Sequence, residues 1–202
     1  MEFIEGIPDD WTVDTDFYGN NHYIFQPLFS EEQCDEIVSI GDKLKKVVAT
    51  IKNNENSKVD EGVRTSKVSW IPMNKETRWI YEWIWNSVQN TNGWKLDVRG
   101  FHDNLQYTVY DAKDGVAQYD WHTDTGPDMN HRKISLTIQL SNPDEYKGGE
   151  FELERAGMLI KPEYVKRGSA IMFPSIFKHR VLPITDGIRK SLVVWIAGPH
   201  IR

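Results

Sequence analysis

The chain has 202 residues, and its 24 basic and 30 acidic side chains give a formal net charge of −6 at pH 7 with histidine neutral. This length is typical of one domain, and an acidic chain without a basic run is a poor candidate for a protein that binds nucleic acid. The single cysteine excludes an internal disulfide, and the lack of a secretory leader or a long apolar run predicts a cytoplasmic protein without a membrane span.

Two helices are predicted in the first half of the chain. Ser30 and the three residues after it match a capping box, and Cys34 begins an apolar stripe that continues the helix to about residue 46. We expect Cys34 to be a small buried hydrophobe of that stripe. Residues 52–62 show no hydrophobic period and predict a mobile loop. A second helix is predicted over about 75–90, with a stripe formed by Trp79, Ile80, Trp83, Ile84 and Val88.

From about residue 95 onward, short runs rich in β-branched and aromatic residues alternate with glycine, proline, aspartate and asparagine. Such strands after two helices favour an all-β core with flanking helices, namely a jelly roll (double-stranded β-helix) that the helices buttress. We expect one domain over 1–202, with helical support over about 1–95 and the jelly-roll core over about 96–200. The strands are predicted near 104–110, 119–124, 133–141, 149–154, 158–160, 169–173, 178–184 and 190–197.

A histidine and an aspartate two residues apart, His122 and Asp124, end one of the predicted strands. Residues i and i+2 of a strand project from the same face, so the two side chains can share one metal ion. His179 lies in a later strand that can return beside the first one in a roll. Two imidazoles and one carboxylate on one side of a metal are the ligand set of non-haem Fe(II) oxygenases. The spacing alone leaves open a surface His–Asp pair with an unrelated core histidine.

Ten residues after His179, Arg189 lies where the chain leaves a predicted turn at 185–187 and enters the last predicted strand. Arg189, Ser191 and Trp195 alternate onto one face of that strand. A guanidinium that points into a barrel is costly unless it meets an anion, and its planar fork suits a carboxylate. A bound dicarboxylate would supply that anion, and an ion pair within the protein at the barrel rim is the alternative.

Several motifs occur in the same order as in a known family. From about residue 24 to 199 the chain resembles the prolyl-4-hydroxylase-like branch of the 2-oxoglutarate/Fe(II) dioxygenases. The motifs that carry the resemblance are the helix opening at 29–34, the strand pair 105–110 and 118–124, the Gly-Gly-Glu turn at 148–150 and the segment from 173 to 195.

The resemblance implies that His122, Asp124 and His179 ligate Fe(II) and that Arg189 binds the distal carboxylate of 2-oxoglutarate. It also implies O2 as the oxidant, with ascorbate as a stimulatory reductant. Many animal and plant prolyl hydroxylases have a lysine in place of Arg189. The arginine therefore puts a collagen-type substrate in doubt, without affecting the reaction class.

Four further residues have weaker roles in this comparison. Tyr110 is where related enzymes place a hydroxyl on the same carboxylate, and an ordinary strand aromatic is the alternative. Ser191 forms an Arg-x-Ser pair like that of other branches. Trp195 either forms a wall of the substrate entrance or packs in the core. His131 is expected to be a solvated or lid residue rather than a fourth ligand.

The implied reaction couples oxidative decarboxylation of 2-oxoglutarate to hydroxylation of a C–H bond. A peptidyl proline is the first expectation for the substrate, by analogy with the branch, and a free amino acid, another protein side chain or a small metabolite stays open. A non-catalytic jelly-roll binding or structural module is the alternative from another class. The loops 52–62, 111–118 and 125–132 are candidates for a closing lid.

Overall fold

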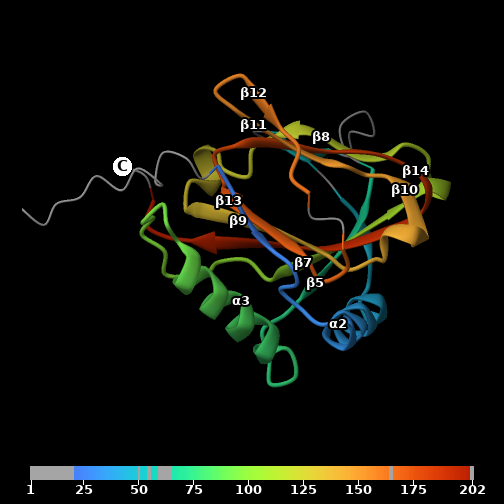
Figure 1. Cartoon of the computed structure of the whole chain (residues 1–202), viewed down its shortest axis with the longest axis horizontal. Coiled ribbons are helices and arrows are strands. Elements are labelled where there is room, and N and C mark those ends of the chain that lie inside the picture. The colour runs from blue at the N-terminus through green and yellow to red at the C-terminus, as the bar shows by residue number, and fades with distance from the viewer. Residues whose placement is uncertain (1–20, 50, 54–55, 59–64, 164–165, 201–202) are drawn as a thin grey trace, which may run out of the picture.

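The computed structural model describes residues 21–49, 51–53, 56–58, 65–163 and 166–200. In this part of the chain, antiparallel strands form a flattened roll with two helices on one side of it (Figure 1). Neither of these helices is long and apolar enough to cross a membrane.

One large sheet dominates the described chain, and its neighbouring strands follow the order β1-β13-β9-β14-β7-β5-β2, with β6, β8, β10 and β11 also paired to β14 and β12 paired to β11. This is the predicted jelly roll with flanking helices. The strands are β1 (Tyr23–Phe25), β2 (Val47–Val48), β3 (Ile51–Asn53), β4 (Asn56–Lys58), β5 (Lys67–Ile71), β6 (Gly100–Phe101), β7 (Leu105–Asp111), β8 (Ala117–His122), β9 (Arg132–Gln139), β10 (Tyr146–Gly148), β11 (Phe151–Arg155), β12 (Met158–Ile160), β13 (Ala170–Pro174) and β14 (Lys178–Ala197).

Helix α2 (Glu31–Lys43) begins at the predicted capping box. The Ser30 hydroxyl accepts the backbone N–H of Gln33 at 3.2 Å, and the Gln33 side chain accepts the N–H of Ser30 at 2.8 Å. The helix ends before the predicted residue 46, because Leu44 is extended and the chain turns into β2, which pairs with β5. Cys34 is fully buried on this helix, as predicted.

Helix α3 (Arg78–Thr91) starts three residues later than predicted. The side-chain oxygen of Asn74 accepts hydrogen bonds from the backbone N–H groups of Glu76 and Thr77. These bonds hold the residues before the helix in a turn, so the helix starts after them. Most of the predicted stripe faces the core. Trp83 is the exception, since it is 49 % exposed at the edge and its indole N–H donates to the carbonyl of Leu28 at 2.8 Å.

Strand β14 joins the two layers of the roll. Its first part pairs with β8, β10 and β11, and its last part pairs with β6, β7 and β9. The prediction of separate strands at 178–184 and 190–197 is therefore wrong. The turn signal at 185–187 bends the strand without ending it, because Asp186 and Gly187 still pair with β10.

The N-terminal half contributes strands as well as helices, which the predicted helical support did not include. β1 pairs with β13, and β5 pairs with β7. Within the predicted loop 52–62, β3 and β4 pair as a hairpin, so that part of the prediction is wrong, and the rest of the loop lies outside the described residues.

The buried apolar residues form two clusters, one that holds the helices on the sheet and one inside the roll near the site. The larger one lies between the helices and the large layer, and it includes Ile80 and Ile84 of α3 and Leu192 and Val194 of β14. The smaller one lies inside the roll, and it consists of Tyr110, Ala117, Phe151, Leu153, Ile171, Phe173, Val181 and Ile184. The inside of the roll, where the predicted site residues lie, is therefore lined largely by apolar side chains.

Candidate metal centre and its pocket

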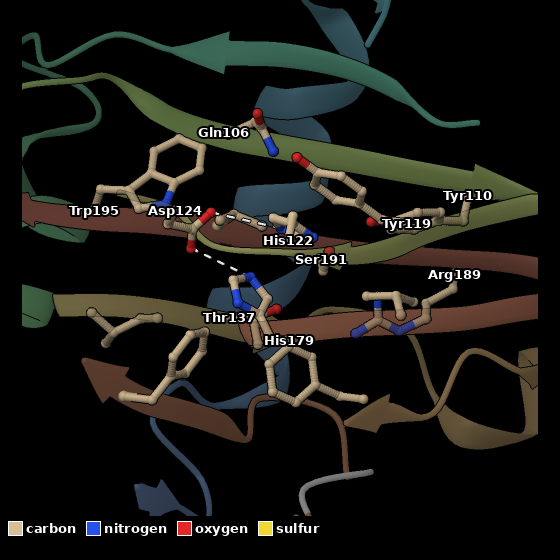
Figure 2. Close-up of a pocket in the computed structure, with 15 residues that line it drawn as sticks. Gln106, Tyr110, Tyr119, His122, Asp124, Thr137, His179, Arg189, Ser191 and Trp195 are labelled. Carbon is tan, nitrogen blue, oxygen red and sulfur yellow. Dashed lines mark ion pairs between the residues drawn. The ribbon is translucent and has the colours of Figure 1, made fainter. Parts of the chain in front are cut away.

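The predicted triad comes together inside the roll. His122 at the end of β8 is the register partner of His179 at the start of β14, and the two rings lie 4.1 Å apart. Asp124 lies to one side of both rings, with one carboxylate oxygen 3.7 Å from Nε2 of His122 and the other 3.4 Å from Nε2 of His179 (Figure 2). The three ligand atoms are therefore close enough to converge on one ion.

Backbone carbonyls determine how both rings present their nitrogens. Nδ1 of His122 lies 2.7 Å from the carbonyl oxygen of Asp120, and Nδ1 of His179 lies 3.0 Å from that of Phe177. A carbonyl only accepts hydrogen bonds, so each neutral ring carries its proton on Nδ1 and its lone pair on Nε2. Both Nε2 lone pairs are therefore available to a metal.

The aspartate of the triad is buried and held in its ionised form. Burial alone would raise the pKa of Asp124, but His179, His122 and a hydrogen bond from Ser135 outweigh burial and lower it. The Ser135 hydroxyl donates to the carboxylate at 2.7 Å and lies 2.9 Å from the hydroxyl of Ser175. The third ligand is thus charged and fixed in orientation.

Arg189 is 2 % exposed, and it lines the same pocket at the end away from Asp124 and Trp195 (Figure 2). It is the register partner of Tyr110, and its guanidinium carbon lies 5.7 Å from the centre of that ring. Gly149 has φ +73°, and a Cβ there would come within 3.0 Å of Cδ of Arg189. The glycine of the Gly-Gly-Glu turn therefore leaves room for the arginine.

The predicted alternation along β14 is confirmed. Ser191 and Trp195 line the pocket with Arg189, whereas Leu192 and Val194 face the helices. The structure thus brings every predicted site residue to one pocket. The full lining is Gln106, Tyr110, Tyr119, His122, Asp124, Leu136, Thr137, Phe151, Phe173, His179, Val181, Arg189, Ser191, Val193 and Trp195.

Trp195 lines the pocket although it is only 7 % exposed. The guanidinium of Arg132 stacks on its ring at 3.7 Å and donates to one oxygen of Asp103 at 2.8 and 3.0 Å. Another nitrogen of Arg132 lies 3.5 Å from the backbone oxygen of Asp124. The pocket wall and the segment that carries Asp124 are therefore tied together by one arginine.

Sequence reasoning missed several residues of the site. The ring of Tyr119 stacks on His122 at 3.4 Å and 13°, and Gln106 and Thr137 line the pocket. The sequence could have indicated two of them, because Gln106 shares a strand face with Tyr110, and Thr137 is a polar residue in an otherwise apolar run. Nothing in the sequence indicates that Tyr119 stacks on His122.

The expectation that His131 is solvated is wrong. This residue is 8 % exposed, its ring packs 4.1 Å from that of His102, and its backbone oxygen accepts the N–H of Gly198. It precedes β9 and takes no part in the triad. The neighbouring lid candidates, 111–118 and 125–132, contain the short 3₁₀ helices Ala112–Asp114 and Pro127–Met129. Their closure over a substrate stays a prediction.

Known proteins resemble the chain in both sequence and fold. The model of the 2OG-Fe(II) oxygenase superfamily matches residues 105–197, which include the triad and Arg189. A PKHD-type hydroxylase of Rippkaea orientalis is 39 % identical over an alignment of 168 residues, and the match covers 71 % of this chain and 73 % of the relative. One of Crocosphaera subtropica is 31 % identical over 121 residues, or 55 % of this chain and 50 % of the relative.

Solved structures agree on the fold. A prolyl-4-hydroxylase of Pseudomonas putida superposes with a TM-score of 0.65 at 18 % identity, covering 91 % of this chain and 96 % of that one. A Trichoplax adhaerens prolyl hydroxylase, solved with a peptide fragment of the hypoxia inducible factor oxygen degradation domain, gives 0.68 at 15 % identity, covering 90 % and 86 %. The sequence relatives and the family model show that the chain belongs to the 2OG-Fe(II) oxygenase superfamily, as an oxygenase similar to the PKHD-type hydroxylases that uses Fe(II), 2-oxoglutarate and O2.

Proposed function

We propose that this oxygenase hydroxylates a peptidyl proline and that His122, Asp124 and His179 hold its Fe(II). The donor set fits the ion, because two neutral imidazoles and an ionised carboxylate converge from one side and leave the opposite positions open. Bound Fe(II), with 2-oxoglutarate and O2, supplies the oxidation of the C–H bond, and the protein supplies position and exclusion of water. The observation that carries the proposal is that the triad and the buried Arg189 line the same pocket.

Arg189 is proposed to bind the distal carboxylate of 2-oxoglutarate, with help from the hydroxyls of Tyr110 and Ser191. A charge-assisted contact in a site that excludes water is strong, and the guanidinium can meet a carboxylate with two parallel N–H donors. Arg189 and His179 lie on the same strand, so the rigid backbone of β14 sets the distance between the anion site and the metal ligands. A dicarboxylate held by Arg189 would extend along the pocket toward the triad.

Trp195 is proposed to contact the substrate, because its ring forms the pocket wall beside Asp124 at the end away from Arg189 (Figure 2). Arg132 stacks on one face of the Trp195 ring. The part of the ring that faces the pocket is flat and apolar, and it therefore suits a compact aliphatic ring such as that of proline. The peptide seen in the Trichoplax relative supports a peptide substrate. A free amino acid or small metabolite is the second candidate, because the pocket itself does not require a polypeptide.

A mass-spectrometric screen tests the proposal. Proline-containing peptides, free amino acids and small metabolites are incubated with Fe(II), ascorbate, 2-oxoglutarate and O2. We expect a gain of one oxygen atom on a proline-containing peptide, together with succinate. Hydroxylation of free amino acids alone would contradict the peptide substrate, and succinate formation without any oxidised compound would leave only the reaction class.

We also propose a single oxygenase domain located in the cytoplasm. Cys34 is a buried free thiol whose pKa burial raises to about 11, and both an unpaired thiol and Fe(II) suit a reducing compartment. Cell fractionation tests the location, and limited proteolysis tests the domain, which we expect to remain as one resistant fragment.

A further inference from the structure

A second cluster of the same composition as the triad lies outside the pocket. His102 and Asp103 follow β6, and His131 immediately precedes β9, so two segments of the chain that are distant in sequence meet at this point. Like the triad, the cluster consists of two imidazoles and one carboxylate whose ligand atoms lie within 4.8 Å of one another. Its chemistry is therefore that of a site for an ion that prefers nitrogen ligands.

The spacing of this second cluster also matches that of the triad. Its two rings lie 4.1 Å apart, which is the distance between the rings of His122 and His179. Nδ1 of His102 lies 3.6 Å from one oxygen of Asp103, compared with 3.7 Å between His122 and its aspartate partner. Ligand atoms around a tetrahedral Zn²⁺ are about 3.4 Å apart at Zn–N distances of about 2.1 Å. His102 and Asp103, whose ligand atoms are 3.6 Å apart, need to move very little to bind such an ion.

His131 supplies an independent observation. The residue is 8 % exposed, and its Nε2 has no hydrogen-bond partner among the described residues. An unpaired polar atom that is buried away from water is costly, and each such atom in a native structure needs an explanation. A metal ion or its bound water at the cluster would satisfy this nitrogen.

Asp103 is already fixed in orientation by Arg132. The guanidinium holds one carboxylate oxygen with two hydrogen bonds and leaves the other oxygen beside His102. Such an outer contact orients a ligand before the ion arrives. Because the arginine also neutralises part of the charge, the cluster favours an ion bound mainly by imidazole over Ca²⁺ or Mg²⁺, which need several oxygen ligands.

We propose that His102, Asp103 and His131 form a second binding site for a divalent transition ion of the Zn²⁺ or Ni²⁺ class. The remaining coordination positions are filled by water, because His102 lies at the surface and opens the cluster to solvent. The site is separate from the triad and does not depend on the proposed hydroxylation.

A Zn²⁺ titration of the untagged full chain against a chromophoric chelator tests this proposal. The parent protein should bind two equivalents, and His102→Ala and His122→Ala should each bind one. The double variant should bind none. Asp97→Asn is the matched control, because it changes an exposed carboxylate outside both clusters and should retain two equivalents.

His102 is 64 % exposed, so its replacement should not disturb folding, and the result stays readable even if a His131 variant does not fold. Histidine-ring NMR gives a second readout, since the one equivalent that His122→Ala still binds should shift the ring nitrogens of His102 and His131. One equivalent bound by the parent protein, or a second equivalent that persists in His102→Ala with unshifted His131 signals, would overturn the proposal.

Discussion

Replacing Arg189 by alanine should sharply weaken the binding of 2-oxoglutarate. The guanidinium is 2 % exposed, so its contact with the distal carboxylate is made almost entirely away from water. Loss of one member of a buried ion pair costs about 3–5 kcal/mol. At about 1.4 kcal/mol per tenfold change, the dissociation constant should rise by roughly two to three and a half orders of magnitude. Arg189→Lys should recover part of this loss, because it restores the charge without the planar fork.

The assay is anaerobic calorimetry of 2-oxoglutarate binding to the Fe(II)-loaded protein. Lys190→Ala is the control, since it removes the adjacent cation of β14, which instead pairs with Asp42 at 2.7 Å. Lys190→Ala should bind 2-oxoglutarate as the parent protein does, and Fe(II) affinity should be nearly unchanged in both variants. A dissociation constant for Arg189→Ala within about threefold of the parent value would refute the reasoning, because a buried charged contact cannot be worth so little.

Three further changes test the supporting structure. Ser135→Ala removes the hydrogen bond to Asp124 and should lower metal affinity by about 10–100-fold, measured by Mn(II) titration; an unchanged titration would contradict the orienting role. Gly149→Ala places a side chain at φ +73° beside Arg189 and should cost at least about 1–2 kcal/mol in the free energy of unfolding, measured with urea; equal midpoints would contradict it. Cys34→Ala should leave turnover nearly unchanged. Burial raises the pKa of the Cys34 thiol to about 11, so in the parent protein this thiol should resist iodoacetamide at pH 8 until the protein is unfolded. Rapid labelling of the folded protein would show that the thiol is accessible.

The chemistry of the site was predictable because it depends on short-range geometry. His122 and Asp124 are only two residues apart, so both reach the same pocket although β8 ends at His122 and not at 124 as predicted. The alternation after Arg189 separates pocket residues from core residues without any knowledge of the fold. Helix α2 was predictable for a similar reason, since its start is determined by a local capping box. These features need only a few neighbouring residues.

What could not be predicted depends on contacts between distant segments. The turn signal at 185–187 usually ends a strand, but here pairing with β10 carries β14 through it. Short strands such as β1 have too few residues to show a period, and only their partners make them strands. Ser135 reaches the triad from β9 through tertiary packing, and the burial of His131 has the same origin.

The central claim is that His122, Asp124 and His179 hold the Fe(II) that the oxidation of 2-oxoglutarate by O2 requires. The most direct measurement is Fe(II)-dependent formation of succinate from 2-oxoglutarate, made together with Mn(II) binding, for the parent protein, His122→Ala, Asp124→Ala and His179→Ala. His22→Ala serves as a control outside the pocket. We predict that the parent protein and the control form succinate and bind the metal, and that each triad variant remains folded but loses both properties. Undiminished Mn(II) affinity in His122→Ala and His179→Ala, or succinate formation that persists in them, would contradict the account.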